Sequence, residues 1–406
     1  MGNVRGGVSA TAQRGAAAAR HYSGPSDRDR RLDILRGAAV LLLGVELVMQ
    51  VIGFGDNRPF ESTGTVSALG LIVVTEGALV GMRYRPRLAS GAIGETMIRL
   101  WRRARGWYLA VIGATLGTLA LRLAPAIETG PITEVSRGSD RPSLFAPPVV
   151  DSAGVDIGYP VDPHLVLDTA ALRLGPWPFD VVSVLCVLFL LAPIALVALQ
   201  RGRWALLVAV SAALWLVEIF TQVRLLPTRA ESSLPILGWQ FVFVSGMVAG
   251  YYRRELVQWF RTASGLVVFF VLAIAGIGWV VAPLVVNPGS SDLLDDYFGA
   301  QSGWLFEASA PGPLRIVVAL LLVVVSYGAL TAVWRPLNLG LGWLLVPLGK
   351  NILRSLVSLI VAALVIVSVP ALRDSDLPPA LTTAIALACV WGVIRLIDLV
   401  VERTRS

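Results

Sequence analysis

Two carboxylates inside apolar stretches are the residues of this chain with the clearest chemical potential. Glu46 lies in the apolar run 38–49, and Glu76 lies within Val73-Val74-Thr75-Glu76-Gly77-Ala78. A carboxylate within a membrane-spanning helix is costly and is by default a functional-site candidate. At 1.5 Å per residue, Glu46 lies about 20 Å from the start of an outward-running helix, and Glu76 about 18 Å from the start of an inward-running one. We therefore expect the two acids at similar depth on neighbouring helices.

Two carboxylates at that separation would share a proton, which raises the pKa of one of them. Such a pair suits general acid–base chemistry or proton passage, so Glu46 and Glu76 are the candidate catalytic residues. The alternative is a pair of protonated or arginine-paired acids that only specify helix packing.

An arginine cluster follows in Arg99-Leu100-Trp101-Arg102-Arg103-Ala104-Arg105. Residues 99, 102 and 105 are three apart and fall on one face of a helix. The planar guanidinium fork suits phosphate groups, so the cluster could hold a nucleotide-bearing donor. The alternative is a charge cluster that only fixes the orientation of the helix in the membrane, or one that contacts anionic lipid.

Two further segments are candidates for binding a carbohydrate acceptor. Asp180 stands at the beginning of an apolar helix after Gly175-Pro176-Trp177-Pro178-Phe179, where helix capping is the competing role. Trp239 and Gln240 place an aromatic ring and an amide inside another apolar run. A buried amide needs a partner, so Gln240 should face the bundle or a cavity. The two histidines, His21 and His164, lie outside the apolar runs, and no metal-binding pattern is present.

Composition defines the elements that must position these groups. The chain has 406 residues, of which 55% are hydrophobic and only 15% are charged. Its mean hydropathy is +0.72. A soluble protein would carry about a quarter charged residues. The apolar residues also form blocks of about 20, the length of a helix that crosses a bilayer. The fold class is therefore all-α, a polytopic membrane protein for which the lipid bilayer is the first partner.

The blocks predict about ten transmembrane helices. They cover approximately 33–54, 64–84, 105–124, 179–199, 204–221, 234–252, 264–286, 313–334, 350–370 and 378–400. Basic residues fall on alternate connections, which places both termini in the cytoplasm by the positive-inside rule. The net charge of +7 thus comes mainly from basic residues that set the membrane orientation, and it does not indicate nucleic-acid binding. Before the ninth helix, 339–349 is apolar but broken by glycines, so a re-entrant piece packed inside protein is the alternative there.

The remaining segments are a tail and two long connections. Residues 1–29 are rich in Gly, Ala, Ser and Arg and predict a disordered cytoplasmic tail. The domain is then 30–402, with extracytoplasmic loops 125–178 and 287–312. The two cysteines have neither metal nor disulfide spacing.

The order of several motifs resembles the OpgC family, membrane succinyltransferases of periplasmic glucans within the wider acyltransferase family 3. The first-helix segment Arg31-Leu32-Asp33-Ile34-Leu35-Arg36-Gly37-Ala38-Ala39 carries the strongest likeness. The resemblance continues through later segments over about 27–370, namely Gly77, Tyr84, Arg99, Arg102, Arg103, Tyr108, Trp177, Pro178, Phe179, Asp180, Ala192, Pro193, Arg201, Gly202, Arg203, Trp204, Trp239, Gln240 and Phe241.

The resemblance implies a cytoplasmic acyl-CoA donor as co-substrate, with no bound cofactor, and an extracytoplasmic carbohydrate acceptor. Arg99 and Arg102 would match the pair near the donor phosphates, and Arg36 and Arg103 are further donor-binding candidates. Asp180, Trp239 and Gln240 would serve the acceptor. We thus expect an integral O-acyltransferase of the plasma (inner) membrane, succinyl- or acetyltransferase-like, acting on an envelope glycan or glycolipid.

The chain departs from the family pattern at the expected catalytic pair. An Asp-His pair toward the outer end of the first helix reads Glu46-Leu47 here, and the second-helix acid, expected near Gly70, is replaced by Glu76 almost two turns later. The alternative function is therefore a catalytically inactive relative that acts as a transporter, flippase or envelope-assembly partner. The identity of the acyl group, the acceptor and the oligomeric state stay open.

Overall fold

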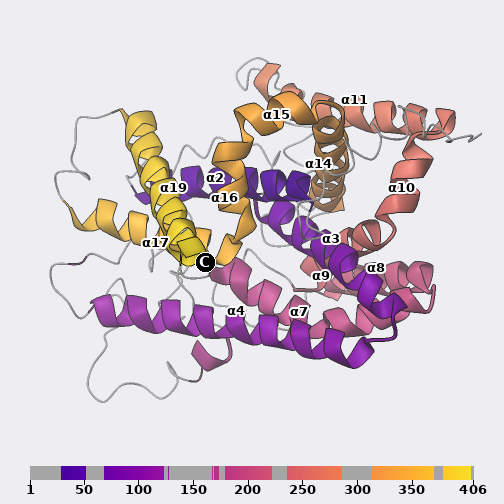
Figure 1. The fold of residues 1–406 in the computed structure, drawn as a ribbon, viewed down its shortest axis with the longest axis horizontal. Coiled ribbons are helices and arrows are strands. Elements are labelled where there is room, and N and C mark those ends of the chain that lie inside the picture. The colour runs from indigo at the N-terminus through magenta and orange to yellow at the C-terminus, as the bar shows by residue number, and fades with distance from the viewer. Residues whose placement is uncertain are drawn as a thin grey trace, which may run out of the picture.

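A computed structural model describes residues 29–51, 68–122, 127, 167, 169–172, 179–221, 236–285, 313–369 and 378–403. This part of the chain is entirely helical, with thirteen helices and no strand (Figure 1). The all-α class is thus confirmed. The predicted tail, most of the loop 125–178, all of the loop 287–312, and both histidines lie outside the described residues.

Each predicted apolar block coincides with one long helix. These are α2 (Arg30–Val51), α3 (Ala68–Ala89), α4 (Ile93–Arg122), α7 (Phe179–Gln200), α8 (Trp204–Thr221), α9 (Ile236–Tyr251), α11 (Ala263–Val285), α14 (Pro313–Ala332), α17 (Ile352–Ser368) and α19 (Pro379–Arg403). Three short helices, which the sequence did not predict as such, are α10 (Arg253–Phe260), α15 (Trp334–Gly340) and α16 (Gly342–Lys350).

Several helices have the length and apolarity of membrane spans. Three described helices, α4, α7 and α19, meet the criteria for a span alone, and the number rises to six if three bent pairs each count as one span. These pairs are α10 with α11, α14 with α15, and α16 with α17, bent by 94°, 95° and 99°. The chain is therefore a membrane protein by these criteria, while ten spans and cytoplasmic termini stay predictions.

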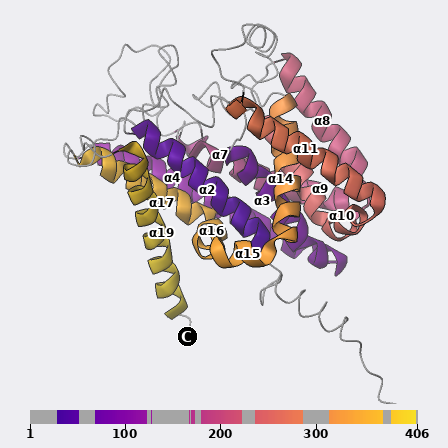
Figure 2. The ribbon, with the colours of Figure 1, turned by 90° about the horizontal axis from the view of Figure 1, so that it is seen from above.

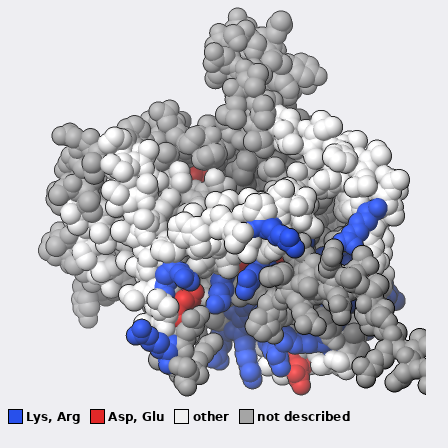
Figure 3. Space-filling view, turned by 45° about the horizontal axis from the view of Figure 1, so that its top comes forward, with Lys and Arg blue, Asp and Glu red and all other residues white. Residues whose placement is uncertain are grey.

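The helix ends meet in a pattern that agrees with alternating crossings. The beginning of α2 contacts the end of α14, because Arg31 donates to Thr331 Oγ1 at 2.7 Å. The end of α3 contacts the end of α9, because Arg85 donates to the carbonyl oxygen of Tyr251 at 2.6 Å. Figure 3 shows basic side chains gathered along one part of the visible face, beside a broad, mostly uncharged surface. This segregation is what the positive-inside rule leads one to expect of a membrane protein.

Helices α3 and α9 run parallel and approach closely through small residues. Their glycines at a spacing of four, two on each helix, face the backbone of the partner: Gly77, Gly81, Gly246 and Gly250. A Cβ atom at Gly77 would collide with the carbonyl oxygen of Phe243, and one at Gly246 with that of Val74. Spacing of this kind allows helix backbones to touch where no hydrophobic driving force exists between them.

Helix α2 is the element around which the others are arranged. It contacts α3, α14, α16, α17 and α19, and it lies between α19 and α3 in Figure 2. Helix α16 packs directly against it, since a Cβ at Gly37 would strike the carbonyl oxygen of Leu345 and one at Gly349 that of Asp33. The glycine-broken segment 339–349 thus spans the end of α15 and most of α16, of which α16 packs on α2, while Leu339 and Trp343 are exposed.

The substitution Gly246→Ala tests the parallel α3–α9 contact. We expect it to lower stability by about 1–3 kcal/mol, because the new methyl group forces the two backbones apart. Gly113→Ala in α4 is the matched control, since nothing lies within 4 Å of a Cβ at Gly113. Thermal unfolding of the detergent-solubilised protein measures both. Equal melting temperatures for the two variants would contradict the close contact.

Candidate functional site

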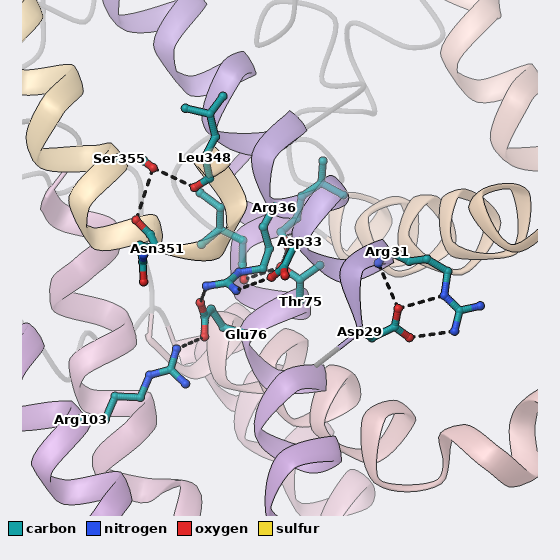
Figure 4. Close-up of polar contacts among 12 residues, drawn as sticks. Asp29, Arg31, Asp33, Arg36, Thr75, Glu76, Arg103, Leu348, Asn351 and Ser355 are labelled. Atoms are coloured by element: carbon teal, nitrogen blue, oxygen red, sulfur yellow. Dashed lines mark hydrogen bonds and ion pairs between the residues drawn. The ribbon is translucent and has the colours of Figure 1, made fainter. Parts of the chain in front are cut away.

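The carboxylate of Glu76 forms the centre of a buried ion-pair cluster that joins three helices (Figure 4). Its side chain, on α3, is completely buried. One oxygen accepts a hydrogen bond from Arg36 on α2. The other accepts from Arg103 Nη2 on α4 at 2.5 Å. Glu76 therefore fixes the first three long helices of the described chain relative to one another.

The cluster is balanced in charge. Arg36, whose side chain is 4% exposed, also forms an ion pair with Asp33 at 3.4 Å, one turn earlier on α2. Two guanidinium groups thus face two carboxylates. Because an uncompensated charge in a low-dielectric interior is very costly, this balance is the condition under which Asp33, Arg36 and Glu76 can be buried.

Arg103 is held on its other side by aromatic rings. Its guanidinium carbon lies 4.4 Å from the ring centroid of Phe189 and 5.8 Å from that of Trp107. Phe189 in turn packs edge-to-face against Trp107 and Phe243, with centroids 5.4 and 5.8 Å apart. These contacts place the cation over the negative faces of the rings, which restricts its orientation toward Glu76.

Glu76 and Glu46 are placed differently relative to Arg36. Glu76 pairs with Arg36, and Glu46 stands ten residues after Arg36 on α2, which is about 15 Å along the helix. A similar depth of the two acids stays a prediction. Glu46 itself is partly buried, and its neighbour Leu47 is 1% exposed within the core.

The other predicted arginines of α4 lie on the surface. Arg99 and Arg102 are exposed, as is Arg105, and Arg99 pairs with Glu95 at 3.3 Å. Arg103 points inward instead, with 23% of its side chain exposed. The structure thus separates the four predicted donor-binding arginines into two sets, with Arg36 and Arg103 inside and Arg99 and Arg102 outside.

The predicted acceptor-binding residues lie in different surroundings. The amide of Gln240 accepts from Ser211 Oγ at 2.8 Å and donates to its carbonyl oxygen at 2.7 Å, which ties α9 to α8. Trp239 is 5% exposed, and its buried indole nitrogen has no hydrogen-bond partner within the described part of the chain. Asp180 is the second residue of α7, and its side chain lies outside the described residues.

A second polar cluster, which the sequence analysis missed, surrounds the beginning of α2. Asp29, 2% exposed, accepts from Arg31 Nη2 at 2.8 Å, Arg253 Nη1 at 2.7 Å and Tyr327 Oη at 2.7 Å. Burial raises the pKa of Asp29, but Arg31, Tyr327 and Arg253 together outweigh burial and hold it below its usual value. The signal in the sequence was the acid two residues before Arg31, at the border of the apolar run. Within the described residues, no group of His, Cys, Asp or Glu side chains could hold a metal ion.

Replacing Glu76 by Gln tests the charge balance of the cluster. We expect a loss of about 3–5 kcal/mol, because Arg36 would remain buried without its full counter-charge. Glu95→Gln is the control, since it breaks an exposed pair with Arg99 worth about 0–1 kcal/mol. Thermal or denaturant unfolding in detergent measures the two losses. A Glu76→Gln protein as stable as the control variant would show that the cluster does not hold the helices.

The comparisons with known proteins agree with the motifs of the first helix. No curated protein matches the chain significantly. The model of the family described as OpgC protein matches residues 28–401, which is nearly the whole chain and includes α2 through α19. This match supports a membrane-associated, acyltransferase-like function on glucans. The chain belongs to the OpgC family.

Proposed function

We propose that this protein is an O-acyltransferase of the plasma (inner) membrane that transfers an acyl group, such as succinyl or acetyl, from cytoplasmic acyl-CoA to an extracytoplasmic envelope glycan or glycolipid. The observation that carries the proposal is the family match over residues 28–401. The charged groups on α2 and α4 support the proposal. The exposed Arg99 and Arg102 of α4 suit the phosphates of the donor, and Glu46 of α2 suits a base for the acceptor hydroxyl.

In the proposed reaction, a sugar hydroxyl oxygen attacks the thioester carbonyl carbon. A C–O bond forms, the C–S bond breaks, and the coenzyme leaves as a thiolate. The hydroxyl proton passes to a base and then to the leaving sulfur. A carboxylate can serve as that base when partial burial raises its affinity for a proton. Glu46 is our candidate, since it is partly buried and lies outside the ion-pair cluster of Glu76.

The roles of the arginines follow from their surroundings. We propose that Arg99 and Arg102 bind the donor phosphates, because both are exposed on one face of α4. Arg36 and Arg103 are already neutralised by carboxylates. We therefore propose that these two, with Glu76, are positioning residues that hold α2 at a fixed distance from α4. This replaces their expected donor-binding role and the expected catalytic role of Glu76.

Of the three residues expected to bind the acceptor, we retain Trp239 and Asp180. Gln240 uses both ends of its amide on Ser211, so we assign it to helix packing. Trp239 offers an indole N–H that lacks a partner in the described chain, and Asp180 stands at the beginning of α7. We propose that these two contact the acceptor or the acyl group.

The substitution Glu46→Gln should abolish acyl transfer without loss of folding, because an amide cannot accept the hydroxyl proton. The measurement is the acyl mass increment on the envelope glycan, from mass spectrometry of cells that carry the variant in a deletion background. Expression and melting temperature should match those of the wild type. Unchanged acylation would rule out Glu46 as the base.

The double substitution Arg99→Gln/Arg102→Gln should raise the KM for the acyl-CoA donor by about tenfold or more and leave the KM for the acceptor unchanged, because charge-assisted phosphate contacts contribute about 1.5–3 kcal/mol. Arg203→Gln, an exposed arginine between α7 and α8, is the control for loss of surface charge. An equal donor KM in the double variant and the control would contradict the assignment.

A non-enzymatic role is the second candidate, and one observation favours it. Leu47 occupies the position where the family resemblance leads one to expect a histidine, and it is buried in the hydrophobic core. A transporter or assembly partner would leave the acylation profile of a deletion strain intact while altering the amount of glycan outside the cell. Loss of the acyl increment in that strain supports the enzyme.

A further inference from the structure

Helix α10 is a short amphipathic helix at the surface of the described structure. Its eight residues, Arg253–Phe260, include none that is buried. Arg254, Glu255 and Gln258 form one face, and the other carries Leu256, Val257, Trp259 and Phe260 together with Arg253. Leu256 and Trp259 are 37% and 44% exposed. An exposed apolar face beside a charged face is typical of a helix that lies in a membrane interface.

Helix α10 is nearly perpendicular to α11, which is the orientation expected of an interfacial helix beside a membrane-spanning one. It is bent by 94° from the apolar α11. The bend is tight, because a Cβ at Gly265 would collide with the carbonyl oxygen of Trp259. Phe260 packs edge-to-face on Phe269 of α11, with centroids 6.1 Å apart. If α11 crosses the bilayer, α10 therefore lies along its surface.

Two ion pairs connect α10 to the interior helices. Arg253 donates to Asp29 at the beginning of α2 at 2.7 Å, and Glu255 accepts from Arg85 of α3 at 2.5 and 2.7 Å. The hydrogen bonds from Arg85 lower the pKa of Glu255 to about 2, so its carboxylate is ionised at neutral pH. The Arg85–Glu255 pair is thus electrically neutral, whereas Asp29 is shared by Arg31 and Arg253.

Two cations of this segment form no ion pair among the described residues, although the charge of Arg254 contributes to the lowered pKa of Glu255. Arg254 projects from the polar face of α10, and Arg261 follows its last turn; both are exposed. They share a segment with the apolar Leu256 and Trp259. We propose that this surface, residues 253–261, binds anionic phospholipid headgroups of the leaflet it faces, which is the cytoplasmic one in the predicted topology.

The combination of groups favours lipid over a soluble phosphate. A phosphodiester headgroup would meet the guanidinium groups of Arg254 and Arg261 while its acyl chains meet Leu256 and Trp259. A free phosphate or a nucleotide would use only the cations and would leave the two exposed apolar side chains in water. Each arginine near an anionic surface contributes about a tenfold factor or less in affinity.

The test uses the purified full-length protein titrated with phosphatidylglycerol or phosphatidylcholine in detergent, with bound lipid counted by native mass spectrometry. We expect phosphatidylglycerol to bind in preference, and Arg254→Gln/Arg261→Gln to weaken it about tenfold. Arg201→Gln/Arg203→Gln removes two exposed charges between α7 and α8 and is the matched control, with affinity close to wild type. Inorganic phosphate at millimolar concentration should not displace the lipid.

A second measurement does not depend on the arginine variants. Phosphatidylglycerol brominated in its acyl chains should quench the part of the tryptophan fluorescence that Trp259→Phe removes. The proposal is overturned if the Arg254/Arg261 variant binds lipid as the wild type does, if the control loses as much affinity, if phosphate displaces the lipid, or if Trp259 is not quenched.

Discussion

The structure depends on one constraint, which is that the buried carboxylate of Glu76 must be neutralised. The side chain is completely buried, and guanidinium groups from two other helices neutralise it. Arg36 approaches from α2 and Arg103 from α4. The relative positions of α2, α3 and α4 follow from this requirement, and so does the level of α2 at which the first-helix motif is held. The same motif supplies Asp33, which completes the charge balance.

Glycine-mediated contacts on either side make this arrangement rigid. Gly77 and Gly246 allow α3 and α9 to touch along their backbones, and Gly37 and Gly349 do the same for α2 and α16. Helix α3 is thus fixed by van der Waals contact on one side and by charge on another. Glu46 lies ten residues after Arg36 on the same helix. In the proposed function, positioning is assigned to Glu76 and chemistry to Glu46, whereas the sequence analysis combined both acids in one catalytic pair.

The sequence predicted the helices well because membrane insertion depends on length and apolarity, which are local properties. Every apolar block became a helix, whereas the arginine-rich segment 99–105, expected before the third helix, lies inside α4. The blocks 264–286, 313–334 and 350–370 begin or end at the bends before α11, after α14 and before α17, but apolarity alone could not show that α10, α15 and α16 are helices bent by 94–99° from them. The partner of Glu76 was also missed, because it depends on how α2 and α4 pack on α3. Gln240 shows the same limit, since its need for a partner was predictable but the identity of Ser211 was not.

The claim that Glu76 is a counter-charge and not a reacting group is tested most directly with the double substitution Glu76→Gln/Arg103→Gln. It removes one charge of each sign and leaves the Arg36–Asp33 pair balanced. The measurement is the rate of acyl transfer per folded molecule, together with the melting temperature. The account predicts that the double variant regains stability relative to Glu76→Gln alone and transfers acyl groups within about tenfold of the wild-type rate. A double variant that is as stable as the wild type yet inactive would contradict it and would assign the chemistry to Glu76.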